Sequence, residues 1–130
     1  FLGLGRGDPH RRFGRYRAAL ENTFIAARTV AGEPNDPAMA ARDRLTLSAF
    51  EPTYDVDAIE PAVRYVNAAV ARGSWAILVF HQVLPKRGGE GDTSIAVHQR
   101  ILDLVQDRRL WCAPMGAVFS HLTGDRALPI

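Results

Sequence analysis

The residue of this chain best placed to do chemistry is His81. It directly follows six apolar residues, Trp75-Ala76-Ile77-Leu78-Val79-Phe80. A short, unbroken apolar run predicts a strand that is buried on both faces, as in a parallel sheet. The carboxyl ends of such strands are where α/β folds carry their catalytic residues. The sequence therefore predicts that His81 lies where a substrate can bind.

Two interpretations of His81 remain open at this point. A histidine exchanges protons near neutral pH, so His81 could act as a general acid or base. Alternatively, it is a core histidine whose ring is satisfied by a backbone carbonyl. The position of His81 in the sequence favours neither interpretation over the other.

Arg28 is a second candidate, because it ends the apolar run Phe24-Ile25-Ala26-Ala27. If that run is a strand parallel to residues 75–80, Arg28 lies at the same sheet edge as His81. A guanidinium group there could hold a carboxylate or an acyl oxygen. A structural ion pair is the alternative role for this arginine.

The remaining candidates are predicted to be structural. His98 falls on the apolar stripe of a predicted helix, which favours packing over catalysis. His10 and His121 lie in a predicted arm and at the surface, and we assign them no role. Cys112 is the only cysteine, so no internal disulfide can form, and its apolar surroundings predict a small buried hydrophobic residue.

Common site motifs are absent from the sequence. It contains no His-Glu-x-x-His, no His-x-x-x-His, no Cys-x-x-Cys and no Gly-x-Ser-x-Gly. No Gly-x-Gly-x-x-Gly opens a helix after a predicted strand, so the sequence gives no support for a dinucleotide site. A complete metal site within this chain is therefore not predicted.

The composition limits the classes of partner. The 130 residues suffice for one domain, and a net charge of +2, from 16 basic and 14 acidic residues, does not favour nucleic acid as a partner. No apolar run reaches the length of a membrane span, and the first residues do not resemble a signal peptide. The compartment stays unknown. Because the chain does not begin with methionine, we expect it to be a piece of a longer protein.

Periodicity and turn residues predict alternating helices and strands. We expect an arm or loop over residues 1–15, a domain over 16–124 and a tail over 125–130. Within the domain we expect a short helix over 16–20, strands over 24–30, 45–50, 75–80 and 110–113, and helices capped by Asp55 or Asp57, by Thr93 or Ser94, and starting at Met115. Residues 85–92 are predicted to form a flexible loop. This order predicts an α/β fold with parallel strands and crossover helices, and about four strands suggest an incomplete barrel.

Three segments carry a resemblance to a known family. Residues 24–30 resemble a strand that ends in Ala-Arg, and residues 73–81 resemble a Gly-Trp-apolar motif that closes on a histidine. Residues 97–115 resemble the closing helix and strand of the same domain. Together they resemble the C-terminal half of a polysaccharide deacetylase, of carbohydrate esterase family 4 with its NodB homology domain, over residues 20–122.

The resemblance implies a distorted (β/α) barrel and a hydrolase that removes acetyl groups from N-acetylated sugars. It implies that His81 is the acid that protonates the leaving amine, that Val79 lines the pocket for the acetyl methyl group, and that Arg28 orients or tunes His81. The family uses a divalent metal, zinc or similar, held by one aspartate and two histidines. Its partners are acetylated polysaccharides or oligosaccharides, and its members are often exported.

The chain departs from the family in its N-terminal motifs. The Thr-Phe-Asp-Asp motif, which brings the base and a metal ligand, is absent, as is His-x-x-x-His. The Arg-x-Pro-Tyr motif has only a poor match at residues 12–16. On this basis the chain keeps the acid but not the base or the metal, and we expect no turnover from it alone. The alternative is an inactive carbohydrate-binding or structural α/β remnant. A third alternative is an unrelated α/β fragment, which stays open if the ends of the strands that carry Arg28 and His81 lie far apart. Exposed sheet edges in half a barrel predict self-association.

Overall fold

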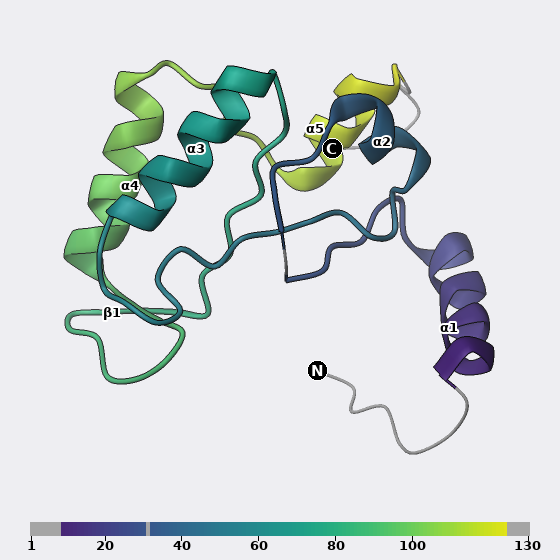
Figure 1. Ribbon diagram of the computed structural model, residues 1–130, viewed down its shortest axis with the longest axis horizontal. Helices are drawn as coiled ribbons and strands as arrows, with labels where there is room; N and C mark the ends of the chain where they lie inside the picture. Colours follow the sequence, from purple (N-terminus) through teal and green to yellow (C-terminus); the bar gives the residue numbers. More distant parts are fainter. Residues whose placement is uncertain (1–8, 31, 125–130) are drawn as a thin grey trace.

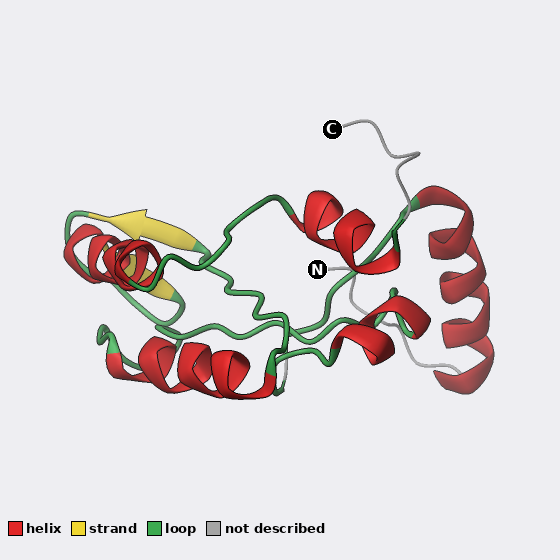
Figure 2. Cartoon of the chain, turned by 90° about the horizontal axis from the view of Figure 1, so that it is seen from above, coloured by secondary structure: helices red, strands yellow, loops and turns green. Residues whose placement is uncertain are grey.

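The computed structural model, which describes residues 9–30 and 32–124, contains five helices and a group of extended segments that cross the molecule between them (Figures 1 and 2). The described elements are α1 (Pro9–Thr23), α2 (Pro37–Arg42), α3 (Glu60–Arg72), β1 (Gln82–Leu84), β2 (Asp92–Ser94), α4 (Ile95–Asp107) and α5 (Met115–Thr123). The fold is mixed α/β, as predicted. The described residues do not show a barrel, because β1 and β2 are their only regular strands.

Three extended segments pair in parallel at the centre of the molecule. In the middle segment, Leu47 donates its N–H to the carbonyl of Ala27 (3.0 Å) and Phe50 donates to the carbonyl of Ile77 (2.9 Å). The return bonds run from Thr29 to Leu47 (2.7 Å) and from Val79 to Phe50 (2.9 Å). The predicted parallel direction of segments 24–30, 45–50 and 75–80 is confirmed, although the pairing consists of isolated bridges.

Asn35 fastens the start of two of these segments. Its backbone exchanges two hydrogen bonds with Trp75, both 2.8 Å long. Its side-chain Oδ1 accepts from the Ser48 N–H (2.8 Å), and its Nδ2 donates to the carbonyls of Ser48 (2.8 Å) and Trp75 (3.2 Å). One partly buried amide therefore satisfies backbone groups of both segments.

The two regular strands lie on either side of the segment over 85–92 that the sequence predicted as a loop. β1 pairs in parallel with β2, in the register Gln82 with Asp92 and Leu84 with Ser94. The predicted flexible loop over 85–92 is therefore wrong at its end, because Asp92 belongs to β2. The backbone groups of residues 92–94 are paired with β1 before the chain enters α4.

Helices α3 and α4 start and end largely as their end residues predict. Gly73 ends α3 in the left-handed conformation, with φ of 60°, and the Ser94 side chain caps α4 by accepting from the Val97 N–H (3.2 Å). The predicted Asp55 or Asp57 cap of α3 is wrong. The residue before α3 is Ile59, which makes no side-chain cap bond, and Asp57 instead accepts from the Ser94 N–H (2.9 Å).

The segment over 75–80 separates two apolar clusters. Trp75 and Ile77 pack against a cluster of α2, α5 and neighbouring residues, formed by Ala26, Ala40, Leu47 and Phe119. Leu78 and Phe80 pack against the cluster of Ala62, Val97 and Ile101, on α3 and α4. Because side chains alternate along an extended chain, each face of this segment meets a different apolar cluster. The prediction of a strand buried on both faces is wrong in two respects, because residues 75–80 form only isolated bridges and each of them is only partly buried.

The structure differs from the prediction in the N-terminal helix and in the segment that precedes the C-terminal helix. α1 begins at Pro9, which suits the first helical position, so the predicted arm is wrong over residues 9–15. The helix predicted over 16–20 is confirmed but is part of a longer helix over Pro9–Thr23. Residues 110–113 form no strand. The rest of the predicted arm, residues 1–8, and the tail over 125–130 lie outside the described residues.

The α1 helix lies at one end of the molecule, away from the other helices (Figure 1). The Arg44 guanidinium fastens its C-terminal end by donating to the carbonyls of Glu21 (3.1 Å), Phe24 (2.6 Å) and Ile25 (3.0 Å). None of the helices in the described part of the chain is long and apolar enough to cross a membrane.

Replacement of Asn35 by alanine is expected to lower the free energy of unfolding by about 2–4 kcal/mol, because three side-chain hydrogen bonds are lost and backbone groups are left without partners. Urea unfolding measures this loss. The control is Asn22→Ala, since the Asn22 amide is exposed and bonds only the Ala18 carbonyl within α1. Equal effects of the two substitutions would contradict the fastening role of Asn35.

Tyr65 provides a second test, one that depends on pH. Its ring stacks on Phe50 with centroids 4.7 Å apart, and its hydroxyl is buried near the Ile77 backbone without a hydrogen bond of regular geometry. Burial raises the pKa of Tyr65, so above about pH 10 the unfolded chain loses this proton first and the folded state loses stability. Tyr65→Phe keeps the stack and is expected to match or exceed wild-type stability at pH 7.

The measurement is urea unfolding of both proteins between pH 7 and 11. The stability difference is expected to shift in favour of Tyr65→Phe as the pH rises above 10, because phenylalanine has no proton to lose. Parallel curves for the two proteins over this range would contradict the burial of the hydroxyl.

Candidate functional site

An ion pair of histidine and glutamate lies at the carboxyl end of the paired segments. The Nε2 atom of His81 is 3.1 Å from Oε1 of Glu51, and their side chains are 53% and 16% exposed. The carboxylate is therefore mostly covered by protein, whereas the imidazole is open to solvent. This arrangement presents one proton-exchanging side chain and holds its partner in place.

The parallel pairing brings these two residues together. Phe50 and Leu78 pair in parallel, so the residues that follow Phe50 and the residues that follow Leu78 lie at the same end of the paired segments. Glu51 comes directly after Phe50, and His81 comes three positions after Leu78. The prediction that His81 lies at the carboxyl end of a parallel segment is confirmed.

The turn that follows Glu51, residues 51–57, is joined to the loop that follows β1, residues 85–91. The carbonyl of Tyr54 accepts from Nη2 of Arg87 (2.7 Å) and from the N–H of Gly91 (3.0 Å). The buried hydroxyls of Thr53 and Thr93 are hydrogen bonded to each other. These contacts fix the loop beside the ion pair.

Gly91 lies directly against the ring of His81. Its φ of 77° is in the left-handed region, and a Cβ atom added there would lie 3.1 Å from Cδ2 of His81. Only glycine allows this backbone conformation and this close approach together. The loop therefore restricts one side of the imidazole while Glu51 holds Nε2.

Arg28 lies at a different level of the paired segments. Arg28 pairs with Leu47, which precedes Phe50 by three residues. His81 follows Leu78, the residue that pairs with Phe50, by three residues. The two side chains are therefore six residues apart along the strand direction. At roughly 3.3 Å per residue, the backbones of Arg28 and His81 are offset by about 20 Å along the strand direction. The structure thus brings Glu51, and not Arg28, to His81, and the tuning role of Arg28 stays a prediction.

Val79 is half-buried and bonded through its N–H to Phe50. It precedes His81 by two positions, a spacing that places side chains on one face of an extended chain. Its role in lining an acetyl pocket remains a prediction from the family resemblance.

The other histidines and the cysteine have packing or surface positions. His98 makes an edge contact with Phe80, with ring centroids 4.8 Å apart, in agreement with its predicted packing role. His121 is exposed and contacts Trp111. The prediction that Cys112 is buried is wrong, because residues 110–113 form no strand and leave it exposed.

Glu51 is the functional candidate that the sequence analysis missed. The signal was present, since Glu51 is the first residue after the predicted strand over 45–50. Carboxyl ends of neighbouring parallel strands meet at one edge, so this position could have been paired with His81.

The arrangement is suited to general acid–base chemistry. A carboxylate at Nε2 holds the imidazole in one orientation and leaves Nδ1 to exchange a proton with a bound molecule. Among the side chains that the structure describes, in residues 16–30 and 32–124, no three of histidine, cysteine, aspartate or glutamate come together as a metal-binding group. The described residues therefore do not form the ligand set of one aspartate and two histidines.

Comparison with models of protein families, with curated proteins and with solved structures finds no match for this chain.

Substitution of Gly91 by alanine is expected to cost more stability than substitution of Gly73. Both glycines have positive φ, and each replacement costs about 1–2 kcal/mol for the left-handed backbone. Nothing lies within 4 Å of a Cβ at Gly73, whereas at Gly91 the new methyl group meets the His81 ring. Urea unfolding in the wild-type and His81→Ala backgrounds measures the difference.

The excess cost of Gly91→Ala is expected to disappear when His81 is alanine, while the cost of Gly73→Ala stays unchanged. Equal costs of the two glycine substitutions in both backgrounds would contradict the contact between the loop and the imidazole.

Proposed function

We propose that this chain belongs to a polysaccharide deacetylase-like hydrolase, in which His81 is the general acid of the reaction on N-acetylated sugars. The observation that carries the proposal is the pairing of an exposed histidine with a mostly covered carboxylate at the carboxyl end of parallel segments. The resemblance of residues 73–81 to the last motif of the family supports the same role.

In this reaction water adds to the acetyl carbonyl and the C–N bond of the amide then breaks. The leaving nitrogen needs a proton as that bond breaks, because an amine anion is a poor leaving group. Protonated His81 supplies this proton from Nδ1, and Glu51 balances the positive charge that the imidazolium carries before the transfer. Acetate and a free amine on the sugar are the products.

The fixed geometry around His81 serves this role. Glu51 holds Nε2 and Gly91 restricts the ring, so the acid does not have to be ordered when substrate binds. Val79, on the same face of the chain, is the proposed contact of the acetyl methyl group. Arg28 remains a weaker candidate, since its backbone pairs with Leu47, well before the site.

The family's divalent metal does not fit the described residues as a resident group. A metal-binding group of three suitable side chains is absent from the described side chains of residues 16–30 and 32–124, and the Asp-Asp and His-x-x-x-His motifs are absent from the sequence. The proposal is therefore limited to the protonation step and to binding of the acetylated sugar.

Binding tests this proposal without the base or the metal. N-acetylchitotetraose is titrated into the chain, and the imidazole resonances of His81 and His98 are followed by NMR. A saturable shift of the His81 resonance is expected, while His98 stays unchanged because it packs against Phe80. The matched ligand is cellotetraose, which has no acetamido groups and is expected to cause a smaller shift.

The absence of a saturable shift at His81, or an equal shift with cellotetraose, would contradict the proposal and leave the inactive or structural alternative. Acetate release with added zinc or cobalt is expected to stay at the level of a His81→Ala control. Release that disappears in that control would show that the chain completes a catalytic site that we have not identified.

A further inference from the structure

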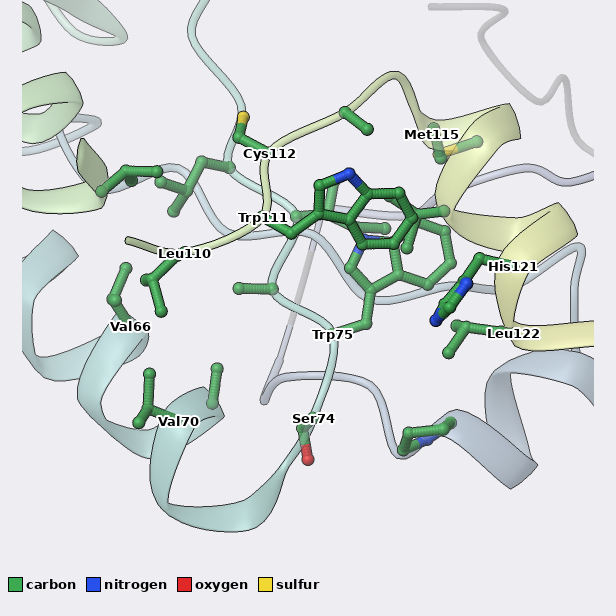
Figure 3. A pocket seen from close by; sticks show the side chains of 18 of the residues that line it. Val66, Val70, Ser74, Trp75, Leu110, Trp111, Cys112, Met115, His121 and Leu122 are labelled. Atoms are coloured by element: carbon green, nitrogen blue, oxygen red, sulfur yellow. The ribbon is translucent and has the colours of Figure 1, made fainter. Parts of the chain in front are cut away.

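A cavity of about 680 Å³ lies between α3 and α4 on one side and α5 on the other, beside segment 75–80 (Figure 3). Its walls come from α3, α4, α5, segment 75–80 and residues 110–113. This volume falls within the range of about 300–1,000 Å³ that is usual for small-molecule sites. Glu51, Val79 and His81 do not contribute to its walls.

The walls of this cavity carry no carboxylate, ammonium or guanidinium group. Apart from Ser74, Cys112 and His121, the side chains that line it are apolar, as Val66, Val70 and Leu110 in Figure 3 illustrate. A charged molecule would lose its hydration here without gaining a charged partner. The lining therefore selects a neutral occupant.

Both tryptophans of the chain, Trp75 and Trp111, line the cavity. The rings of Trp111 and His121 meet edge to face, with centroids 4.9 Å apart, and Trp111 is 59% exposed. Figure 3 shows both indoles and the His121 imidazole at one end of the cavity. Aromatic walls of this kind favour a ligand that itself has an aromatic ring.

Segment 75–80 also offers hydrogen bonds to an occupant. The backbone groups of Ile77 and Val79 that face the middle segment are bonded to Phe50. Those of Ala76 and Leu78 point to the opposite edge, because neighbouring residues of a strand direct their backbone groups to opposite sides. Ala76 and Leu78 line the cavity, and their N–H and C=O groups make no hydrogen bond with another described residue.

We propose that this cavity is a binding site for a small, neutral aromatic molecule that carries one hydrogen-bonding group. The ring packs against Trp111 and Trp75, and the polar group bonds to the backbone edge at Ala76 or Leu78. The site is separate from His81, so the proposal does not depend on the deacetylase assignment.

The test uses N-phenyl-1-naphthylamine, a neutral aromatic probe with one N–H group. Its fluorescence is excited by energy transfer from tryptophan, and both tryptophans lie at the cavity. The matched ligand is 8-anilinonaphthalene-1-sulfonate, which has the same rings and one negative charge. Saturable binding of the neutral probe is expected, with roughly tenfold weaker binding of the sulfonate.

Trp111→Ala is expected to weaken binding of the neutral probe by roughly tenfold, and Trp111→Phe to restore most of the affinity, because phenylalanine keeps an aromatic wall. Direct excitation of the probe is used for these two variants. The control is Ile95→Ala, since Ile95 is an apolar residue of α4 that is 53% exposed and does not line the cavity. It is expected to leave the affinity unchanged.

Three results would overturn the proposal. The first is no saturable binding of the neutral probe. The second is equal affinity for the sulfonate or an equal loss with Ile95→Ala, which would indicate general adsorption to apolar surface. The third is a dimer in sedimentation that excludes the probe, which would show that a second copy covers the cavity.

Discussion

The hydrogen bonds of Asn35 are the constraint on which the central part of the structure depends. The segments that cross the molecule have too few paired residues to form a regular sheet, so little cooperative backbone bonding holds their register. Asn35 compensates for this at one point, since its amide and backbone bind both Ser48 and Trp75. The register fixed at Asn35 determines that Phe50 pairs with Leu78. It also determines that Glu51 and His81 lie next to each other at the end of the segments.

The turn after Glu51 and the loop that passes His81 hold the two side chains of the ion pair in their relative positions. Glu51 is mostly covered, and the turn that it begins is bonded to the loop that passes His81, through the carbonyl of Tyr54. The pair itself, with one partner half exposed, contributes little to stability. Its geometry is thus maintained by neighbouring backbone contacts, which is the condition under which a surface histidine can hold one orientation for proton transfer.

The sequence predicted best where local chemistry decides the structure. Ser94 and Gly73 cap their helices as expected, and the side chains of the apolar run before His81 alternate between two apolar clusters, although none of them is fully buried. The sequence-based prediction failed where contacts between distant segments decide the structure. Residues 110–113 are as apolar as a strand, yet they form no strand and have no backbone hydrogen bond to segment 75–80. Asp57 has the residue type of a helix cap, but the Ser94 N–H competes for its carboxylate. Periodicity carries no information on such partners.

The two edges of segment 75–80 have opposite consequences. On one edge, Ile77 and Val79 bond to Phe50, and this pairing delivers Glu51 to His81. On the other edge, Ala76 and Leu78 meet no strand, since residues 110–113 stay apart, and the space between them becomes an apolar cavity with both tryptophans in its walls. An unpaired backbone edge inside apolar walls is costly unless something bonds to it. The pairing of Phe50 with segment 75–80 therefore has two effects. On one side it brings Glu51 to His81. On the other side it leaves the backbone groups of Ala76 and Leu78 without a strand partner, which favours a bound molecule in the cavity.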